Sequence, residues 1–182
     1  MVIAVTGQKG SGKDTASSYL AENYNYKTYA LAEPIKFIGN YLFGFSTEKD
    51  FNKEEVDPRW GISPRQFWQY FGTELMQWEV QKIPGWKVGR NIWMELFWDT
   101  YEHSPSKNFI ITDLRMQHEK EFLLKAVDEL VVVQIYRKGT GGDFHSSETE
   151  VGSLNPDVII SNNGDLEKLY YKLDEFAMEY GI

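Results

Sequence analysis

The chain of 182 residues is long enough for one domain with a sizeable core, or for one domain that carries an inserted lobe. Its net charge of −8 argues against a nucleic-acid-binding surface, and the absence of cysteine excludes disulfides, thiolate metal sites and cysteine nucleophiles. No apolar run is long enough to span a membrane, and the apolar start MVIAV lacks the basic region of a signal peptide. We therefore expect a cytoplasmic protein without nucleic-acid or membrane partners.

The first half of the chain begins with an apolar, β-branched run at residues 2–6, which predicts a strand buried on both faces. Glycines follow, and the pattern then predicts a helix over about residues 12–23 and a short strand at 27–31. Pro34 is expected to open the next helix. The apolar face of that helix is predicted to hold Ile35, Phe37, Ile38, Tyr41 and Leu42. Residues 45–62 are polar and irregular, which predicts a loop.

The middle of the chain is helical and aromatic. Ser63 fits an N-cap, Pro64 fits the first helical position and Gln66 completes a capping-box spacing, so a helix should begin here. Pro84 and Gly85 should end it, and a second helix is predicted over residues 86–101. All six tryptophans fall in this stretch: Trp60, Trp68, Trp78, Trp86, Trp93 and Trp98. They form the core of a helical lobe, or one or two of them face a cleft and stack on a base.

The last part of the chain alternates strands and helices. Strands are predicted at residues 108–113, 129–137 and 157–162, with a helix after the first of them that ends near Ala126 and another that begins at Asp165. Strands that alternate with helices favour a parallel α/β sheet with helices on both faces. Residues 138–150 are rich in glycine, serine and charge, which predicts a flexible loop.

A phosphate-binding loop is predicted between the first strand and the first helix. Gly7, Gly12 and Lys13 meet the spacing G-x-x-x-x-G-K, and the strand and helix around them are the context that the motif requires. In such a loop, backbone N–H groups and a helix N-terminus face phosphate oxygens, and the lysine reaches the β- and γ-phosphates. The residues predicted to bind the nucleotide are Gly7, Lys9, Gly10, Ser11, Gly12, Lys13, Asp14 and Thr15.

Asp14 stands where this motif usually has the Ser or Thr that binds Mg²⁺. One interpretation is a degraded loop in which Asp14 repels phosphate. The other is a small-molecule kinase that holds Mg²⁺ mostly through water, with Thr15 touching an α-phosphate. In the second case, Asp14 lies in the first helical turn, where the helix dipole favours a carboxylate.

Several separated motifs occur in an order that resembles the deoxynucleoside monophosphate kinases of bacteriophages. They are TGQKGSGKDT, LAEPIK, SPRQFWQYFGTE, ITDLRMQHEKEFL, DFHSSETE and NNGDLEKL, and together they cover nearly the whole chain. The family shares the GKDT ending, so Asp14 is no departure within it. The resemblance implies transfer of the γ-phosphoryl group of ATP, with Mg²⁺, to a deoxynucleoside monophosphate. It also implies an α/β, three-layer P-loop kinase fold over residues 1–182.

The resemblance further implies how this fold is divided. An inserted helical lobe, placed at residues 45–103, would bind the monophosphate substrate, and a lid at residues 138–150 would close over ATP. If the chain is viral, its location would be the cytoplasm of the host. A monomer and a homodimer are both compatible with the sequence.

Acidic and basic residues near the loop are candidates for catalysis. Asp113 ends an apolar strand, where a carboxylate near Mg²⁺ is expected, although it could also cap the helix that follows. Asp14 and Asp113 are thus the predicted metal-site residues, acting through water. Arg115 and Arg65 are predicted to bind the acceptor phosphate, because a guanidinium can form two bonds to it. Each could instead be a solvated surface arginine.

Other candidates follow from position in the motifs. Lys36 could join the cluster that binds the acceptor phosphate, and Gln69 and Thr73 could contact the base or sugar. Trp68 could stack on the base or pack in the core. Arg137 is predicted to bring a cation to the transferring phosphoryl group, or it simply ends a strand.

Two residues of the predicted lid complete the set. His145 and Glu148 lie in HSSE, where they could order the lid or contact substrate. A metal site there is not expected, because the chain has only three scattered histidines and no cysteine.

Two other functions remain open from the sequence. The chain could be another small-molecule P-loop kinase, since TGQKGSGK also resembles dephospho-coenzyme A kinases and GKD resembles animal-type phosphomevalonate kinases. Alternatively, it could be a nucleotide-binding module that hydrolyses ATP slowly without an acceptor, with the aromatic lobe as a partner interface.

Overall fold

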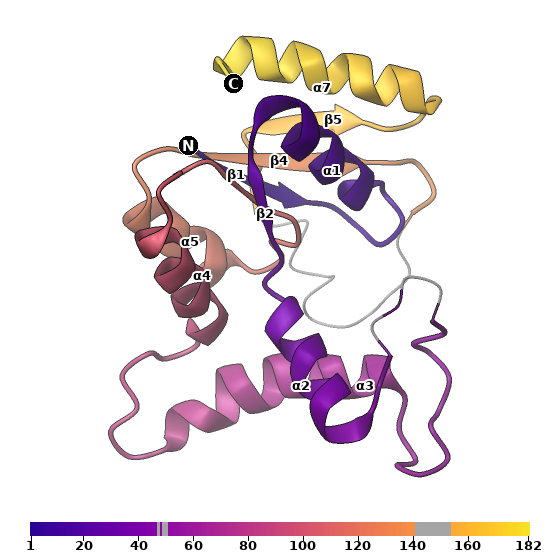
Figure 1. The fold of residues 1–182 in the computed structure, drawn as a ribbon, viewed down its shortest axis with the longest axis vertical. Coiled ribbons are helices and arrows are strands. Elements are labelled where there is room, and N and C mark those ends of the chain that lie inside the picture. The colour runs from indigo at the N-terminus through magenta and orange to yellow at the C-terminus, as the bar shows by residue number, and fades with distance from the viewer. Residues whose placement is uncertain (47, 49–50, 141–153) are drawn as a thin grey trace. The chain divides into compact units, whose positions relative to one another are not determined.

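The computed structural model describes residues 1–46, 48, 51–140 and 154–182. They divide into two compact units, which are considered separately (Figure 1). Residues Met1–Ala30 and Leu96–Ile182 form the sheet unit, and Leu31–Glu95 form the helical unit. The lobe predicted at residues 45–103 overlaps the helical unit, and its role in binding substrate stays a prediction.

The sheet unit is built on five parallel strands in the order β2-β3-β1-β4-β5. They are β1 (Val2–Thr6), β2 (Lys27–Tyr29), β3 (Phe109–Ile111), β4 (Leu130–Tyr136) and β5 (Val158–Ser161). The central strand β1 pairs with β3 on one edge and β4 on the other, and all its residues are buried, as predicted. The chain passes from β1 to the edge strand β2, returns to β3, and then crosses to β4 and β5 on the other side of β1. Ligands of such sheets bind beyond the carboxyl ends of the strands, where the strand order reverses.

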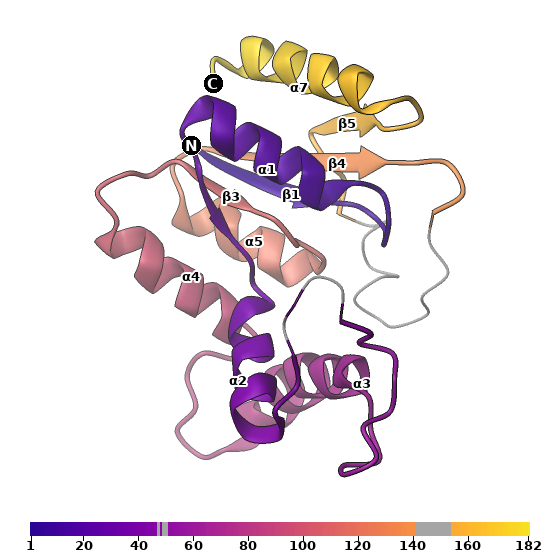
Figure 2. The same ribbon diagram turned by 45° about the vertical axis from the view of Figure 1, so that its right-hand side comes forward.

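Helices cover both faces of the sheet (Figure 2). On one face, α1 (Lys13–Tyr24) and α7 (Leu166–Tyr180) bury Leu20 and Leu173 in a core with Ile3 of β1. On the other face lie α4 (Ile92–His103) and α5 (Gln117–Ala126). There the ring of Phe97 packs edge-on against Phe109, with the ring centroids 5.7 Å apart. The predicted α/β class, with a parallel sheet between helices, is confirmed.

The helical unit contains α2 (Glu33–Phe43), α3 (Pro64–Gln69), the π-helix η1 (Tyr70–Glu79) and the 3-10 turn η2 (Val80–Lys82). The predicted capping box is confirmed, since Gln66 N donates to Ser63 Oγ at 3.2 Å and Ser63 N donates to Gln66 Oε1 at 2.8 Å. The helix ends before Pro84, also as predicted. Its change from α to π geometry at Tyr70 was not foreseen, and it alters which later side chains share a face.

The apolar face predicted for α2 is wrong in part. Ile35 is buried, but Phe37 is 67% exposed, Tyr41 78% and Leu42 56%. The reason is the close packing at Gly39, where an added Cβ would lie 2.8 Å from Trp68 Nε1. Ile35 and Gly39 share one face of the helix, so Phe37 and Tyr41 fall on a different face, where their rings stack on each other.

The helix predicted over residues 86–101 starts later than expected, at Ile92. Residues 86–91 are not helical and contain a turn at residues 88–90, because Gly89 adopts a left-handed conformation with φ of 62° that interrupts a helix. The indole Nε1 of Trp86 donates to the carbonyl of Gly89 at 3.0 Å, which closes this turn. Among the described residues, no helix combines the length and the apolar character needed to cross a bilayer.

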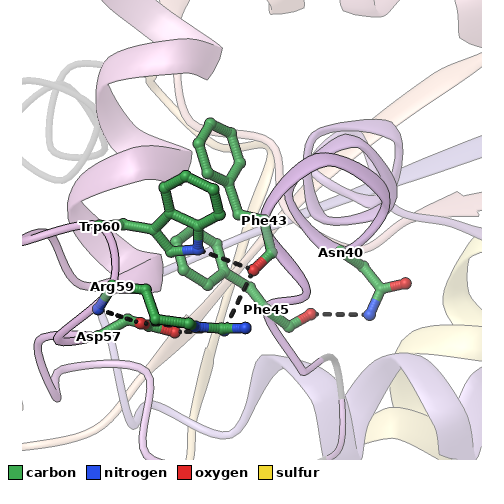
Figure 3. Close-up of polar contacts among 6 residues, drawn as sticks. All are labelled: Asn40, Phe43, Phe45, Asp57, Arg59 and Trp60. Carbon is green, nitrogen blue, oxygen red and sulfur yellow. Dashed lines mark hydrogen bonds and ion pairs between the residues drawn. The ribbon is translucent and has the colours of Figure 1, made fainter.

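The predicted loop at residues 45–62 is irregular in its described part and is tied to the end of α2 (Figure 3). The carbonyl of Phe43 accepts hydrogen bonds from Trp60 Nε1 at 3.0 Å and from the guanidinium of Arg59 at 3.4 Å. Asp57 pairs with the same guanidinium at 2.6 Å, which lowers the pKa of that carboxyl below its usual value. Trp60 therefore has a structural partner at the end of α2.

Candidate active site

The predicted phosphate loop lies between β1 and α1, with the strand, loop and helix in the expected order. Gly7, Gly10 and Gly12 have φ of 140°, 81° and 98°, which side chains rarely adopt. An added Cβ on Gly7 would also lie 2.4 Å from the carbonyl oxygen of Ile135 in β4. The backbone thus curls in a way that requires glycine, as a loop that approaches phosphate closely does.

The interior of this loop fits a phosphate group. Ser11 is buried, and its hydroxyl has no hydrogen-bond partner among the described residues. A buried hydroxyl without a partner is costly unless a ligand or water meets it. The loop opens directly into the N-terminus of α1, where the helix dipole favours an anion.

Lys13 lies folded back over the loop. Its Nζ donates to the carbonyl oxygens of Gly7 at 2.6 Å and Gln8 at 3.0 Å. Asp14 and Thr15 lie exposed in the first turn of α1, as the sequence predicted. Whether either side chain touches phosphate or metal-bound water stays a prediction.

Asp113 and Arg115 lie at the same edge of the sheet, in the segment between β3 and α5. The N–H of Leu114, between them, donates to the carbonyl of Val5 in β1 at 3.1 Å, so this segment runs beside the end of the strand that leads into the loop. Both candidate side chains are half-buried. The alternative that Asp113 caps the next helix is wrong, because the N-cap of α5 is Met116.

Glu119 supports this segment, and the sequence-based prediction missed it. Its buried Oε2 accepts hydrogen bonds from the N–H groups of Arg115 at 2.9 Å and Met116 at 3.0 Å. Burial raises the pKa of this carboxyl to about 7, while the two hydrogen bonds oppose the shift. A glutamate three residues after the N-cap of a helix is the sequence signal from which this role of Glu119 could have been predicted.

Arg137 and Lys138 follow β4 directly, and both are exposed. Residues 137–140 form a turn in which Thr140 Oγ1 donates to the carbonyl of Arg137 at 2.7 Å. The N–H of Lys138 donates to Asn163 Oδ1, also at 2.7 Å. The other lid candidates, His145 and Glu148, lie outside the described residues.

The remaining candidates belong to the helical unit and were expected to meet the acceptor. Arg65 Nε pairs with Glu54 Oε1 at 2.6 Å, and its side chain is 17% exposed, so it is not a solvated surface arginine. Lys36 is exposed on α2. Gln69 is half-buried and Thr73 buried, on either side of the junction between α3 and η1.

Trp68 lies against α2, and its buried Nε1 has no partner among the described residues. This contact favours packing as the main role of the ring. Stacking on a base stays a prediction.

The carboxylates are too few to hold a metal without further ligands. The described residues contain no group of three or more His, Asp or Glu side chains that could do so. Mg²⁺ in phosphoryl-transfer sites is bound by one or two carboxylates together with substrate phosphates and water. That Asp14 and Asp113 hold Mg²⁺ in this way stays a prediction.

Comparison with known proteins decides the family. The sequence model of the deoxynucleotide monophosphate kinase family matches residues 1–56 and 39–173. The chain belongs to the deoxynucleotide monophosphate kinase family. This kinase is 34% identical over 185 residues to a putative deoxynucleotide monophosphate kinase of Acanthamoeba polyphaga mimivirus, covering 95% of this chain and 94% of that one. It is 22% identical to the deoxynucleotide monophosphate kinase of Enterobacteria phage T4, covering 94% and 96% of the two chains.

Solved structures agree on the fold of the kinase. Shikimate kinase from Aquifex aeolicus matches with a TM-score of 0.56 at 15% identity, covering 100% of this chain and 99% of that one. Dephospho-CoA kinase from Campylobacter jejuni matches with a TM-score of 0.50 at 14% identity, covering 98% and 96%. The predicted family, the P-loop kinase fold and the phosphotransferase class are therefore confirmed.

Proposed function

We propose that this protein transfers the γ-phosphoryl group of ATP to a deoxynucleoside monophosphate, giving the diphosphate and ADP. The observation that carries the proposal is the loop of left-handed glycines that leads into Lys13, in a chain of this family. Phosphoryl transfer depends on positioning and on charge stabilisation rather than on covalent chemistry. The acceptor phosphate is already a nucleophile at neutral pH, so no strong general base is needed.

The donor side of the reaction is assigned to the sheet unit. Backbone N–H groups of the loop and the Lys13 ammonium would bind the β- and γ-phosphates of ATP. Asp113 and Asp14, both through water, would orient Mg²⁺, which supplies positive charge to the transferring group when it is bound. Arg137 would add a cation from the turn after β4. These roles rest on the position of the residues at the carboxyl edge of the sheet.

In the helical unit, Arg65 is assigned to the α-phosphate of the monophosphate, with Lys36 as a second cation and with Gln69 and Thr73 as contacts to the base or sugar. In the sheet unit, Arg115 is assigned to the acceptor phosphate on the basis of the family motif alone. Arg65 supports this assignment because its guanidinium is already held in a fixed direction by Glu54. A held guanidinium loses less freedom when it binds a phosphate.

The proposed substrate is tested by measuring ADP release with each common deoxynucleoside monophosphate, with dephospho-CoA and with phosphomevalonate. Turnover that requires a deoxynucleoside monophosphate is expected. Turnover with only one of the other two acceptors would overturn the proposal, and so would ATP hydrolysis that no acceptor changes, as expected of a nucleotide-binding module.

Replacing Arg65 with alanine is expected to raise the KM for the monophosphate by about 10-fold to 100-fold, because a charge-assisted contact to phosphate is lost. The KM for ATP should remain unchanged. Steady-state kinetics with each substrate varied in turn measures both values.

Arg59→Ala is the matched control, because Arg59 also pairs with a carboxylate in the helical unit but at an exposed position. Its effect on either KM should be small. A rise in the KM for ATP in Arg65→Ala would contradict the division of roles between the two substrates.

The cellular setting is also proposed. The relatives from a mimivirus and a phage support the idea that the protein works in the cytoplasm of an infected host. A monomer and a homodimer both remain compatible with the proposed reaction.

A further inference from the structure

Two asparagines follow strand β5, in the motif NNGDLEKL, to which the sequence assigned no role. Asn162 is buried, and its backbone N–H donates to the carbonyl of Tyr136 at 2.7 Å. This bond continues the pairing of β5 with β4, so the backbone of Asn162 is fixed to the sheet. Its side chain is therefore held at the same carboxyl edge as the phosphate loop.

The side chain of Asn162 contacts the phosphate loop directly. Its Nδ2 donates to the carbonyl oxygen of Ser11 at 2.8 Å, in a buried position. The next residue, Gly12, lies so close that an added Cβ would be 2.4 Å from the same nitrogen. The amide of Asn162 thus packs against Gly12 and donates a hydrogen bond to the carbonyl of Ser11.

This contact fixes the direction of a backbone N–H group. The carbonyl of Ser11 and the N–H of Gly12 belong to one planar trans peptide, in which they point in opposite directions. When Asn162 holds the carbonyl on its own side, the N–H of Gly12 must point away from Asn162. Without that bond, this peptide could rotate, because glycine on one side of it permits many backbone conformations.

Among the described residues, no side chain caps the start of the helix that follows. Gly12 is the N-cap of α1, it is left-handed, and it supplies no side-chain cap. Helix N-terminal N–H groups bind anions only when they converge on one point. A side chain that fixes the orientation of the Ser11–Gly12 peptide therefore also fixes the position at which α1 begins.

We propose that Asn162 is a positioning residue for ATP, acting through the Ser11–Gly12 peptide to aim the N–H of Gly12 at the nucleotide phosphates. This inference rests on the proposed use of the loop to bind ATP. It does not depend on which acceptor the enzyme takes.

The test compares Asn162→Ala and Asn162→Asp with the unchanged protein. Alanine removes the donor, and aspartate keeps the shape but replaces the donor with an acceptor that faces the Ser11 carbonyl. Both should weaken ATP binding by about tenfold, the effect of one lost hydrogen bond. The KM for the monophosphate should stay within about twofold, whereas a purely structural residue would change the melting temperature and leave the KM for ATP unaltered.

Asn23→Ala is the matched control, because Asn23 Nδ2 also donates to a backbone carbonyl at 2.8 Å, at the exposed end of α1. It should bind ATP as the unchanged protein does. ATP affinity is measured by titration calorimetry without any acceptor, so the test holds even if the proposed acceptor is wrong. If Asn162→Ala does not fold, Asn162→Asp decides. Unchanged ATP affinity in a folded Asn162 variant would overturn the inference.

Discussion

Lys13→Ala is expected to lower kcat by about 10²-fold to 10³-fold, the effect of removing one group that stabilises charge in a transition state. The Lys13 ammonium already faces the loop, where it is bound to the carbonyls of Gly7 and Gln8. On binding ATP it would exchange these acceptors for phosphate oxygens. The loss should appear mainly in kcat, because the ammonium stabilises negative charge that develops at the phosphates in the transition state more than in bound ATP. Single-turnover kinetics with saturating ATP measures it.

A second lysine separates this effect from a general loss of charge. Lys168 is exposed on α7 and pairs with Asp165 at 3.2 Å, so Lys168→Ala removes the same charge from a residue outside the loop. It should keep nearly full activity. Because Lys13 also bonds the loop, the melting temperature of Lys13→Ala must be compared with that of the unchanged protein. A folded Lys13→Ala variant with near-normal turnover would contradict the proposed site.

Substitutions at Glu119 are expected to give the largest change in stability. Glu119→Ala removes the acceptor of two backbone N–H groups, at Arg115 and Met116, and should cost about 2–4 kcal/mol. Glu119→Gln should avoid this loss of stability, because a single oxygen of Glu119 accepts both hydrogen bonds and glutamine retains one side-chain oxygen. The comparison separates the hydrogen bonds from the charge.

The charge of Glu119 makes stability depend on pH. Burial raises its pKa from the usual 4.5 to about 7, so the folded state binds the proton more tightly than the unfolded chain. This group therefore lowers the free energy of unfolding as pH rises from about 4.5 to about 7. Glutamine does not titrate, so Glu119→Gln should gain about 2 kcal/mol relative to the unchanged protein between pH 5.5 and pH 8.

Urea unfolding at several pH values measures this difference, starting above the pI of about 4.9 so that the protein stays charged. Glu121→Gln is the control, since Glu121 lies exposed on the same helix and accepts a hydrogen bond from the side chain of Gln117. It should change the free energy of unfolding by less than about 0.5 kcal/mol, as is usual for a surface substitution. A difference between Glu119→Gln and the unchanged protein that is constant across this range would mean that Glu119 is ionised in both states.

Local signals in the sequence predicted the fold well. The buried run at residues 2–6, the glycines after it and the capping box at Ser63 each depend on neighbours in the chain, and each is present. The late start of the helix at Ile92 has a local cause in Gly89, whereas the wrong apolar face of α2 has a non-local one. The exposure of Phe37 and Tyr41 depends on where Gly39 meets Trp68, a contact between residues far apart in sequence.

The same distinction applies to the candidate site. The phosphate loop was predicted because its glycines, lysine and helix are contiguous. Glu119 and Asn162 were missed because the role of each residue depends on its hydrogen-bond partners in the folded structure. Asn162 bonds Ser11 from the other end of the chain, and no spacing in the sequence reports that contact. The position of Glu119 in the first turn of a helix could have been predicted, but the contribution of its hydrogen bonds to stability depends on its burial.

The central position of β1 constrains the order in which the parts of the protein can fold during synthesis. This strand leaves the ribosome before β3 and β4, yet Val2 pairs with Phe109 and Leu130, which are synthesised much later. Until then the strand is apolar and has no neighbour on either edge, the condition in which chains associate wrongly. The helical unit is one continuous stretch, Leu31–Glu95, and can form from local contacts during this wait. We therefore expect synthesis to proceed with a folded helical unit first, and closure of the sheet around β1 to be the slow, final step.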